Sequence, residues 1–142
     1  MMLVIGYGNP LRGDDGVGRT VAEAVLAGEL EGCDVVNVQA LLPELAERVA
    51  RSSRAVFVDA RIGPTPGRIS TDAIMPTDAD ATWQGHALGP GAVVRLAGQL
   101  YGWKGDAWLV SIEVTELGYG TGLSAPVAAV VPEAVAAVRR LA

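Results

Sequence analysis

The sequence predicts an α/β protein built around a parallel β-sheet. Apolar segments rich in β-branched residues, typical of strands covered on both faces, occur at residues 2–7, 35–38 and 55–59. Amphipathic helices are expected between them, at residues 16–30 and from Pro43 onward, because apolar residues recur there at helical spacing. The order strand, helix, strand, helix, strand with short connections predicts parallel strands joined by right-handed crossovers.

The second half of the chain is expected to add two strands and two helices. Residues 68–74 form a short candidate strand, expected to be antiparallel and at an edge, and residues 107–114 form a longer apolar strand. A helix is expected from Pro90, because proline suits the first helical turn. Ser124 is a good N-cap for the last helix, which Pro132 should kink or split.

Composition limits the classes of protein to consider. The 142 residues, half of them hydrophobic and 19% charged, predict one folded domain over residues 1–142. A net charge of −5 argues against binding to nucleic acid or to anionic membrane surfaces. Cys33 is the only cysteine, which excludes an internal disulfide, and its apolar neighbours predict a buried, inert thiol. No apolar run has the length of a membrane span or the pattern of a signal peptide, so a cytoplasmic protein is expected.

The glycine-rich loop at residues 5–18 joins the first strand to the first helix, where α/β proteins commonly place their sites. Its third glycine, Gly13, follows Gly8 by five residues, whereas the dinucleotide fingerprint needs three. Asp14 and Asp15 stand where a phosphate-binding loop would carry a lysine, so a dinucleotide or phosphate ligand is disfavoured and a cation is favoured. The alternative is that Asp14 caps the helix and Asp15 lies in its first turn.

Three candidate metal ligands follow from this arrangement. Asp15 comes after the first strand, Asp59 ends the third, and His86, the only histidine, precedes a helix. Because neighbouring parallel strands end at the same edge of a sheet, the two aspartates can converge there, and two carboxylates with one imidazole leave positions open for a substrate. The alternative is that these residues are local caps and surface groups. A serine hydrolase is disfavoured because the chain has no Gly-x-Ser-x-Gly elbow.

The chain resembles the nickel–iron hydrogenase maturation endopeptidases over essentially its whole length. The segments that carry the resemblance are residues 4–18 (VIGYGNPLRGDDGVG), 56–60 (VFVDA), 86–90 (HALGP) and 122–126 (GLSAP). The first segment is specific, and the others occur in the expected order. The resemblance implies a three-layer α/β/α domain whose twisted five-stranded sheet is mostly parallel with one antiparallel strand.

The resemblance also implies an activity, namely removal of a C-terminal extension from the hydrogenase large-subunit precursor after nickel insertion. The family's proposed nickel contacts fall on Asp15, Asp59 and His86, which would serve as both metal and catalytic residues. The nickel would be supplied by the substrate, with no permanently bound cofactor. The family often has glutamate at the first position, and aspartate keeps the carboxylate with a shorter reach. The match places Asp15 in the cleft, with Asp14 as a helix cap or supporting group.

One segment departs from the family pattern. Hydrogenase-specific members commonly carry an Asp-Gly-Gly-Thr-like segment after the second strand, whereas residues 38–45 here read VQALLPEL. Two alternatives therefore stay open. One is a divergent metal-dependent hydrolase that acts on another peptide. The other is a non-catalytic docking module that binds a hydrogenase-like partner through the loops at residues 76–85 and 118–122.

Overall fold

A five-stranded sheet forms the centre of the molecule in the computed structural model, which describes residues 1–76, 88–115, 120 and 122–142. The strands are β1 (Met2–Tyr7), β2 (Cys33–Val38), β3 (Arg54–Ile62), β4 (Ile69–Ala73) and β5 (Asp106–Val114). They lie in the order β2-β1-β3-β5-β4. The pairs β1–β2, β1–β3 and β3–β5 are parallel, and the edge strand β4 is antiparallel to β5. The mostly parallel sheet with one antiparallel edge strand is therefore confirmed.

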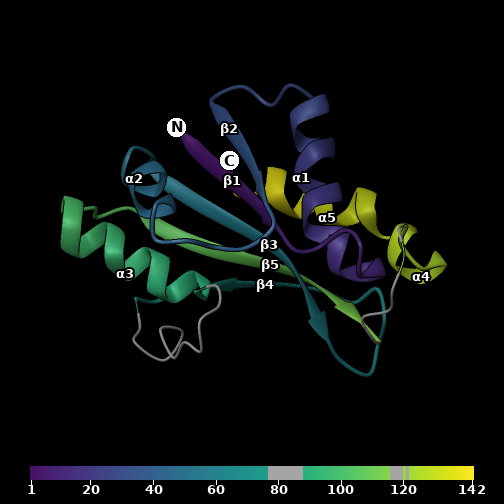
Figure 1. Ribbon diagram of the computed structural model, residues 1–142. Coiled ribbons are helices and arrows are strands. Elements are labelled where there is room, and N and C mark those ends of the chain that lie inside the picture. The colour runs from purple at the N-terminus through teal and green to yellow at the C-terminus, as the bar shows by residue number, and fades with distance from the viewer. Residues whose placement is uncertain (77–87, 116–119, 121) are drawn as a thin grey trace.

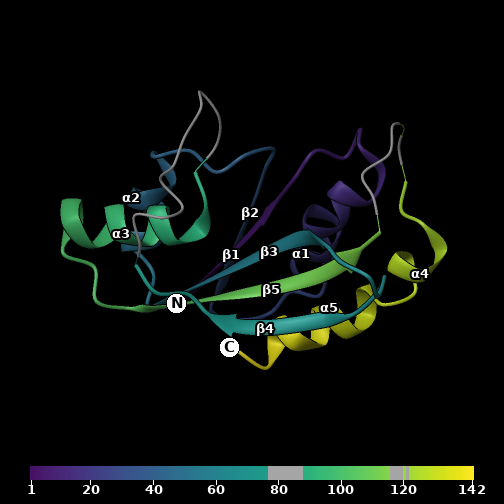
Figure 2. The ribbon, with the colours of Figure 1, turned by 90° about the horizontal axis from the view of Figure 1, so that it is seen from below.

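Helices cover both faces of this sheet, as the sequence predicts (Figures 1 and 2). One face is covered by α1 and α5, and the other by α2 and α3. In chain order the helices are the 3-10 turn η1 (Gly13–Gly16), α1 (Val17–Ala27), α2 (Leu45–Ala50), α3 (Pro90–Tyr101), α4 (Ala125–Ala128) and α5 (Val131–Arg139). The expected split at Pro132 is confirmed, because this residue lies in the first turn of α5.

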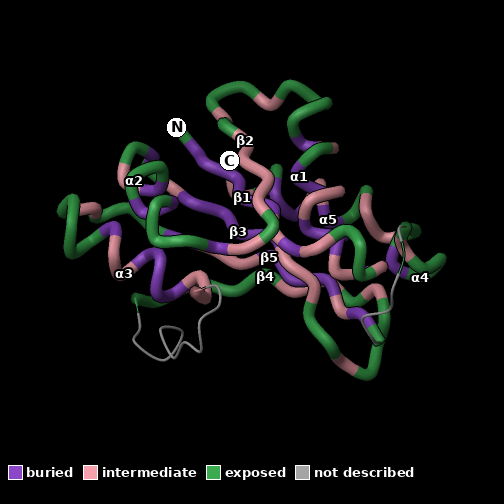
Figure 3. Tube along the Cα trace, viewed as in Figure 1, coloured by how far each residue is buried: buried purple, intermediate pink, exposed green. Residues whose placement is uncertain are grey.

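Alternating residues of each strand divide the core into two clusters, one on each face of the sheet. Figure 3 shows β1 and much of β3 in the colour of buried residues. On β1, Val4 packs on the α1 and α5 face, whereas Leu3 and Ile5 pack on the α2 and α3 face. On β3, Val58 packs on the first face and Phe57 on the second. On β3, the apolar row on the α2 and α3 face is followed by Asp59 toward the carboxyl end of the strand.

The thiol of Cys33 is half-buried, so the prediction of a buried thiol was wrong. The reason is that β2 is an edge strand, so one side of the sheet ends there. Burial, with a smaller contribution from the charge of Asp34, raises the pKa of the Cys33 thiol. A raised thiol pKa leaves little thiolate at neutral pH, which is consistent with the predicted lack of reactivity.

None of the helices within the described residues has the length and apolar character needed to cross a bilayer. The two chain ends lie near each other at the amino end of the sheet (Figures 1 and 2). There the Arg54 guanidinium donates to both carboxylate oxygens of Asp106, at 2.7 and 2.8 Å, and to the carbonyl of Leu141 at 2.7 Å. These hydrogen bonds therefore join the starts of β3 and β5 to the C-terminal residues at this end of the molecule.

Candidate functional site at the carboxyl edge of the sheet

The loop that follows β1 folds back tightly over η1. A Cβ atom on Gly8 would lie 2.0 Å from the carbonyl oxygen of Asp15, and Gly8 has a φ of +137°, so this position requires glycine. The backbone N–H of Asn9 donates to Oδ2 of Asp15 at 2.7 Å. The loop therefore fixes one carboxylate oxygen of Asp15.

A second close approach brings the start of α1 against β3. A Cβ atom on Gly18 would lie 2.2 Å from the carbonyl oxygen of Val58 and 2.9 Å from that of Tyr7. Only glycine permits this contact without moving the helix or the strand. Because Val58 immediately precedes Asp59, the contact sets how closely η1, with Asp15, approaches the end of β3.

Asp59 lies on β3 on the face covered by α2 and α3, where it continues the row of Phe57. Two groups donate hydrogen bonds to its carboxylate: the backbone N–H of Ala60, at 2.7 Å from Oδ1, and the side-chain hydroxyl of Tyr7 on β1. In the neighbouring strand β5, the buried Ser111 is the direct register partner of Asp59. Asp59 thus sits in a polar row where the apolar core ends.

The pKa of Asp59 depends on the groups around its carboxylate. Burial raises the pKa of Asp59 to about 6, the hydrogen bonds from Tyr7 and Ala60 oppose this rise, and the negative charge of Asp15 adds to it. The two carboxylates are therefore close enough to interact. Asp15 and Asp59 therefore lie near each other at this edge of the sheet, as the sequence predicts; their role as metal ligands stays a prediction, in which a cation between them would relieve both the burial cost and the mutual repulsion.

The third predicted ligand, His86, lies outside the described residues. The described chain resumes at Leu88, whose N–H donates to the carbonyl of Leu41 at 3.0 Å, and Leu88 packs in the core between the sheet and α2 and α3. This is the face of the sheet that carries Asp59. Among residues 1–76, 88–115, 120 and 122–142, no three histidine, cysteine, aspartate or glutamate side chains lie together as a metal-binding group.

Of the two roles predicted for Asp14, helix cap or supporting group, its contacts show the second. Asp14 is buried; its Oδ1 accepts the backbone N–H of Ser124 at 2.6 Å and its Oδ2 accepts the Ser124 hydroxyl at 2.7 Å. Ser124 does occupy the N-cap position of α4, but its side chain bonds to Asp14 instead of capping that helix. Asp14 therefore ties α4 to η1 and supports the loop that carries Asp15.

The loops after β1 and β5 are also joined by backbone hydrogen bonds. The N–H of Gly13 donates to the carbonyl of Gly120, and the N–H of Gly120 donates to the carbonyl of Leu11, both at 2.9 Å. Near the end of β5, the carboxylate of Glu113 accepts the N–H of Thr65 at 2.6 Å, which indicates a structural role. Glu116 lies outside the described residues.

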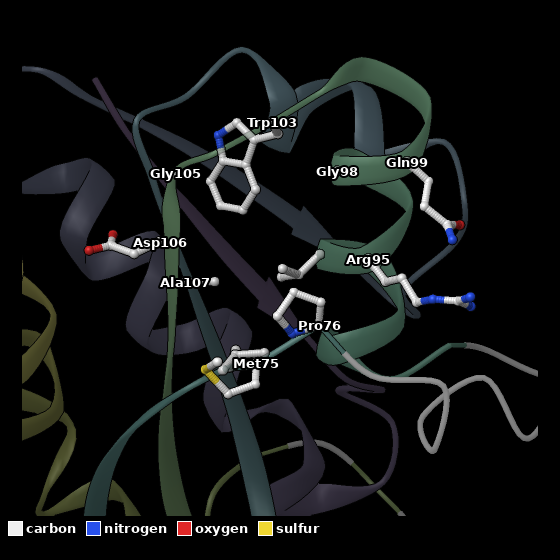
Figure 4. A pocket seen from close by; sticks show the side chains of 11 residues that line it. Met75, Pro76, Arg95, Gly98, Gln99, Trp103, Gly105, Asp106 and Ala107 are labelled. Carbon is white, nitrogen blue, oxygen red and sulfur yellow. The ribbon is translucent and has the colours of Figure 1, made fainter.

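The cavity drawn in Figure 4 lies at the other end of β5. It has a volume of about 420 Å³ between α3, the segment after β4 and the start of β5, and its lining includes Met75, Pro76 and Trp103. Among the described residues that line it, the one carboxylate is Asp106, which points away from the opening and is hydrogen-bonded to Arg54 (Figure 4). These described lining residues therefore do not include a pair of acidic groups like that of the carboxyl edge.

Sequence reasoning missed Tyr7 as a member of the site. In the parallel pairing of β1 with β3, Gly6 is opposite Val58, so Tyr7 comes level with Asp59 on the same face. The available signal in the sequence was that Tyr7 and Asp59 each stand at the end of an apolar run. It could be used only once the pairing of these two strands was known, because an aromatic residue in a strand otherwise indicates core packing.

Comparisons with known proteins identify shared architecture. No family model matches the sequence, and no curated protein matches it either. Among solved structures, the [NiFe] hydrogenase maturation protease HybD from Thermococcus kodakarensis is similar, with a TM-score of 0.78 and 23% identity over 99% of this chain and 98% of that one. The hydrogenase maturating endopeptidase HybD from E. coli gives a TM-score of 0.79 and 21% identity over 96% of this chain and 88% of that one. A hydrogenase 2 maturation peptidase from Thaumarchaeota archaeon SCGC_AB-539-E09 gives a TM-score of 0.73 and 23% identity over 99% of this chain and 96% of that one. The fold is therefore that of these three proteins along nearly the full chain.

Proposed function

We propose that the protein is an endopeptidase that removes a C-terminal extension from a nickel-loaded hydrogenase large-subunit precursor. The observation that carries the proposal is the convergence of Asp15 and Asp59 at the carboxyl edge of the sheet. Two named maturation proteases share the fold over nearly its whole length, which supports the same conclusion. The expected site of action is the cytoplasm.

In this proposal the nickel belongs to the substrate and completes its coordination shell with Asp15, Asp59 and His86. Carboxylate and imidazole groups are acceptable nickel ligands. The observed carboxylates suit this role, because a cation offsets the repulsion that helps to raise the pKa of Asp59 to about 6. His86 precedes Leu88, whose backbone is anchored on the face that carries Asp59, and this supports its inclusion.

The reaction is hydrolysis of one peptide bond. The substrate's nickel acts as a template that holds the scissile peptide in place and as a Lewis acid. A water oxygen adds to the carbonyl carbon, the carbon–nitrogen bond breaks, and a proton passes to the new amine. The task of the protein is to hold the two carboxylates in fixed positions, which it does through the Asn9 bond to Asp15 and the Ala60 bond to Asp59.

The experiment that tests this function is an intact-mass assay with the precursor in nickel-loaded and nickel-free forms. Loss of a C-terminal segment from the loaded form alone is the expected result. Asp15→Asn, Asp59→Asn and His86→Ala should each abolish cleavage, whereas the control Asp72→Asn, on the exposed edge of β4, should cleave at the wild-type rate. Cleavage at the wild-type rate by the His86 variant would refute the proposed ligand set.

A divergent hydrolase that acts on another peptide is the second candidate, and the segment after β2 favours it. The chain has VQALLPEL where hydrogenase-specific members carry an Asp-Gly-Gly-Thr-like segment. Here Leu41 is fully buried and its carbonyl accepts the N–H of Leu88. Leu41 thus serves the core, whereas Gln39, Leu42, Pro43 and Glu44 are exposed where the family's segment would stand, so any contacts with a substrate here would be of a different kind. Cleavage of a different nickel-bearing precursor, with the hydrogenase precursor left intact, would select this candidate.

A further inference from the structure

Tyr7 is the last residue of β1, and its hydroxyl donates a hydrogen bond to the carboxylate of Asp59 on β3. Its ring packs against the core between the sheet and α2 and α3. The strand register explains the contact, because Gly6 is opposite Val58 and the following residues, Tyr7 and Asp59, are therefore level on neighbouring strands. The ring is held by packing, so the direction of the hydroxyl is held with it.

The two groups that donate hydrogen bonds to the carboxylate of Asp59 come from different strands. The Ala60 N–H comes from the same strand, 2.7 Å from Oδ1, and the Tyr7 hydroxyl comes from the neighbouring strand. A single hydrogen bond leaves a carboxylate free to rotate about the bond to its Cβ. A second donor in a different direction fixes that rotation and therefore the direction of the remaining lone pairs.

This orientation matters because Asp15 lies close enough for its charge to act on Asp59. Without a second donor, repulsion between the carboxylates would favour a rotation of Asp59 away from its neighbour. Carboxylates and imidazoles that bind metals are usually oriented by such outer hydrogen bonds, whose loss typically costs about 10- to 100-fold in metal affinity or activity.

We propose that Tyr7 is a positioning residue, which holds the Asp59 carboxylate in the orientation that meets the nickel of the precursor beside Asp15. This inference rests on the proposed function. Tyr7 acts through Asp59 and does not itself touch the metal. Tyr7, at the end of β1, is thereby joined by one hydrogen bond to the proposed nickel ligand Asp59 on β3.

The test is a kinetic comparison of Tyr7→Phe with the wild-type protein on the nickel-loaded precursor. Phenylalanine keeps the ring packing and removes only the donor. We expect kcat/KM to fall about 10-fold, with kcat itself reduced, because a misoriented ligand weakens both the hold on the precursor's nickel and the reaction step. Ser111→Ala is the matched control. Its buried hydroxyl belongs to the register partner of Asp59 on the other side, and it is not among the donors to Asp59.

An unchanged kcat in Tyr7→Phe, or an equal loss in Ser111→Ala, would overturn the inference. A rise in KM without a change in kcat would also overturn it, because Tyr7 would then bind the precursor directly. A melting curve for each variant distinguishes a loss of folding from a loss of positioning.

A second measurement separates this inference from the proposed function. Ni²⁺ alone is added to the wild-type protein and to Tyr7→Phe, and the broadening of backbone amide signals near Asp15 and Asp59 by this paramagnetic ion gives its affinity. We expect binding about 10-fold weaker in the variant. Equal affinity would overturn the role of Tyr7 even if the precursor is cleaved. Weaker binding without any cleavage would retain Tyr7 as the positioning group and refute the proposed substrate.

Discussion

Gly18→Ala tests whether the close approach of α1 to β3 sets the geometry of the site. A Cβ atom at this position would lie 2.2 Å from the carbonyl oxygen of Val58, whereas ordinary contacts begin at 3.4 Å. The obstructing atom belongs to the backbone of a central strand, so no side chain can rotate to make room. The start of α1, and with it η1 and Asp15, would have to move by about 1.2 Å relative to β3.

The expected magnitudes follow from this displacement. Overpacking of a rigid contact typically costs about 1–3 kcal/mol, and the gain in helix propensity from glycine to alanine returns about 0.5–1 kcal/mol. We therefore expect a net loss of about 1–2 kcal/mol in the free energy of unfolding. A misplacement of about 1 Å between reacting groups can cost about 100-fold in rate, so cleavage should fall far more than folding.

The assay combines urea unfolding with the intact-mass cleavage assay. Gly98→Ala is the matched control, because Gly98 lies inside α3 and its new Cβ would meet its nearest atom at an ordinary 3.7 Å. This control should gain about 0.5–1 kcal/mol in unfolding free energy and cleave at the wild-type rate. If Gly18→Ala matches the wild-type protein in both stability and cleavage, the close contact does not position the site and the reasoning fails.

Four substitutions test the supporting contacts and the raised pKa of Asp59. Asp14→Ala removes both hydrogen bonds to Ser124 and should lower the free energy of unfolding by about 2–3 kcal/mol in urea titrations, with Ser124→Ala costing about half as much. The pKa of Asp59 is raised from 3.8 to about 6 in the folded state, so its protonated form stabilises the fold below pH 4 and that stability is lost as the pH rises through 6. Asp59→Asn cannot titrate, so between pH 4 and 8 its unfolding free energy should fall by about 2–3 kcal/mol less than that of the wild-type protein; an equal fall in both would contradict the raised pKa. Arg54→Ala releases the carbonyl of Leu141 and should speed hydrogen exchange at the end of α5, and unchanged protection there would show that this bond is dispensable.

Much of the fold could be predicted because its signals are local. The apolar strands, the start of α3 at Pro90 and the break at Pro132 depend on residues that are near one another in the chain, whereas α2 begins at Leu45, two residues after the predicted Pro43. The parallel order then follows from the alternation of strands and helices, and the meeting of Asp15 and Asp59 follows from the rule that parallel strands end at one edge. These predictions needed no knowledge of packing.

The exposure of Cys33 was predicted less well, because it depends on the position of β2 at the edge of the sheet. Its apolar neighbours gave the correct strand but not the number of elements that cover it. Strand order is set by contacts between distant segments, and a run of apolar residues has the same pattern in an edge strand as in a central one.

The sequence by itself determined the strand–loop–helix segment with its paired carboxylates, since glycine and aspartate carry their conformational and chemical preferences wherever they lie. Only the tertiary structure decided which carboxylate faces which partner. Asp14 binds Ser124, which is 110 residues away in the chain, and Asp59 binds Tyr7 across two strands. Asp14 and Asp15 are the same residue type, so the sequence alone does not distinguish their roles. The packing of distant elements gives Asp14 a structural role and places Asp15 beside Asp59.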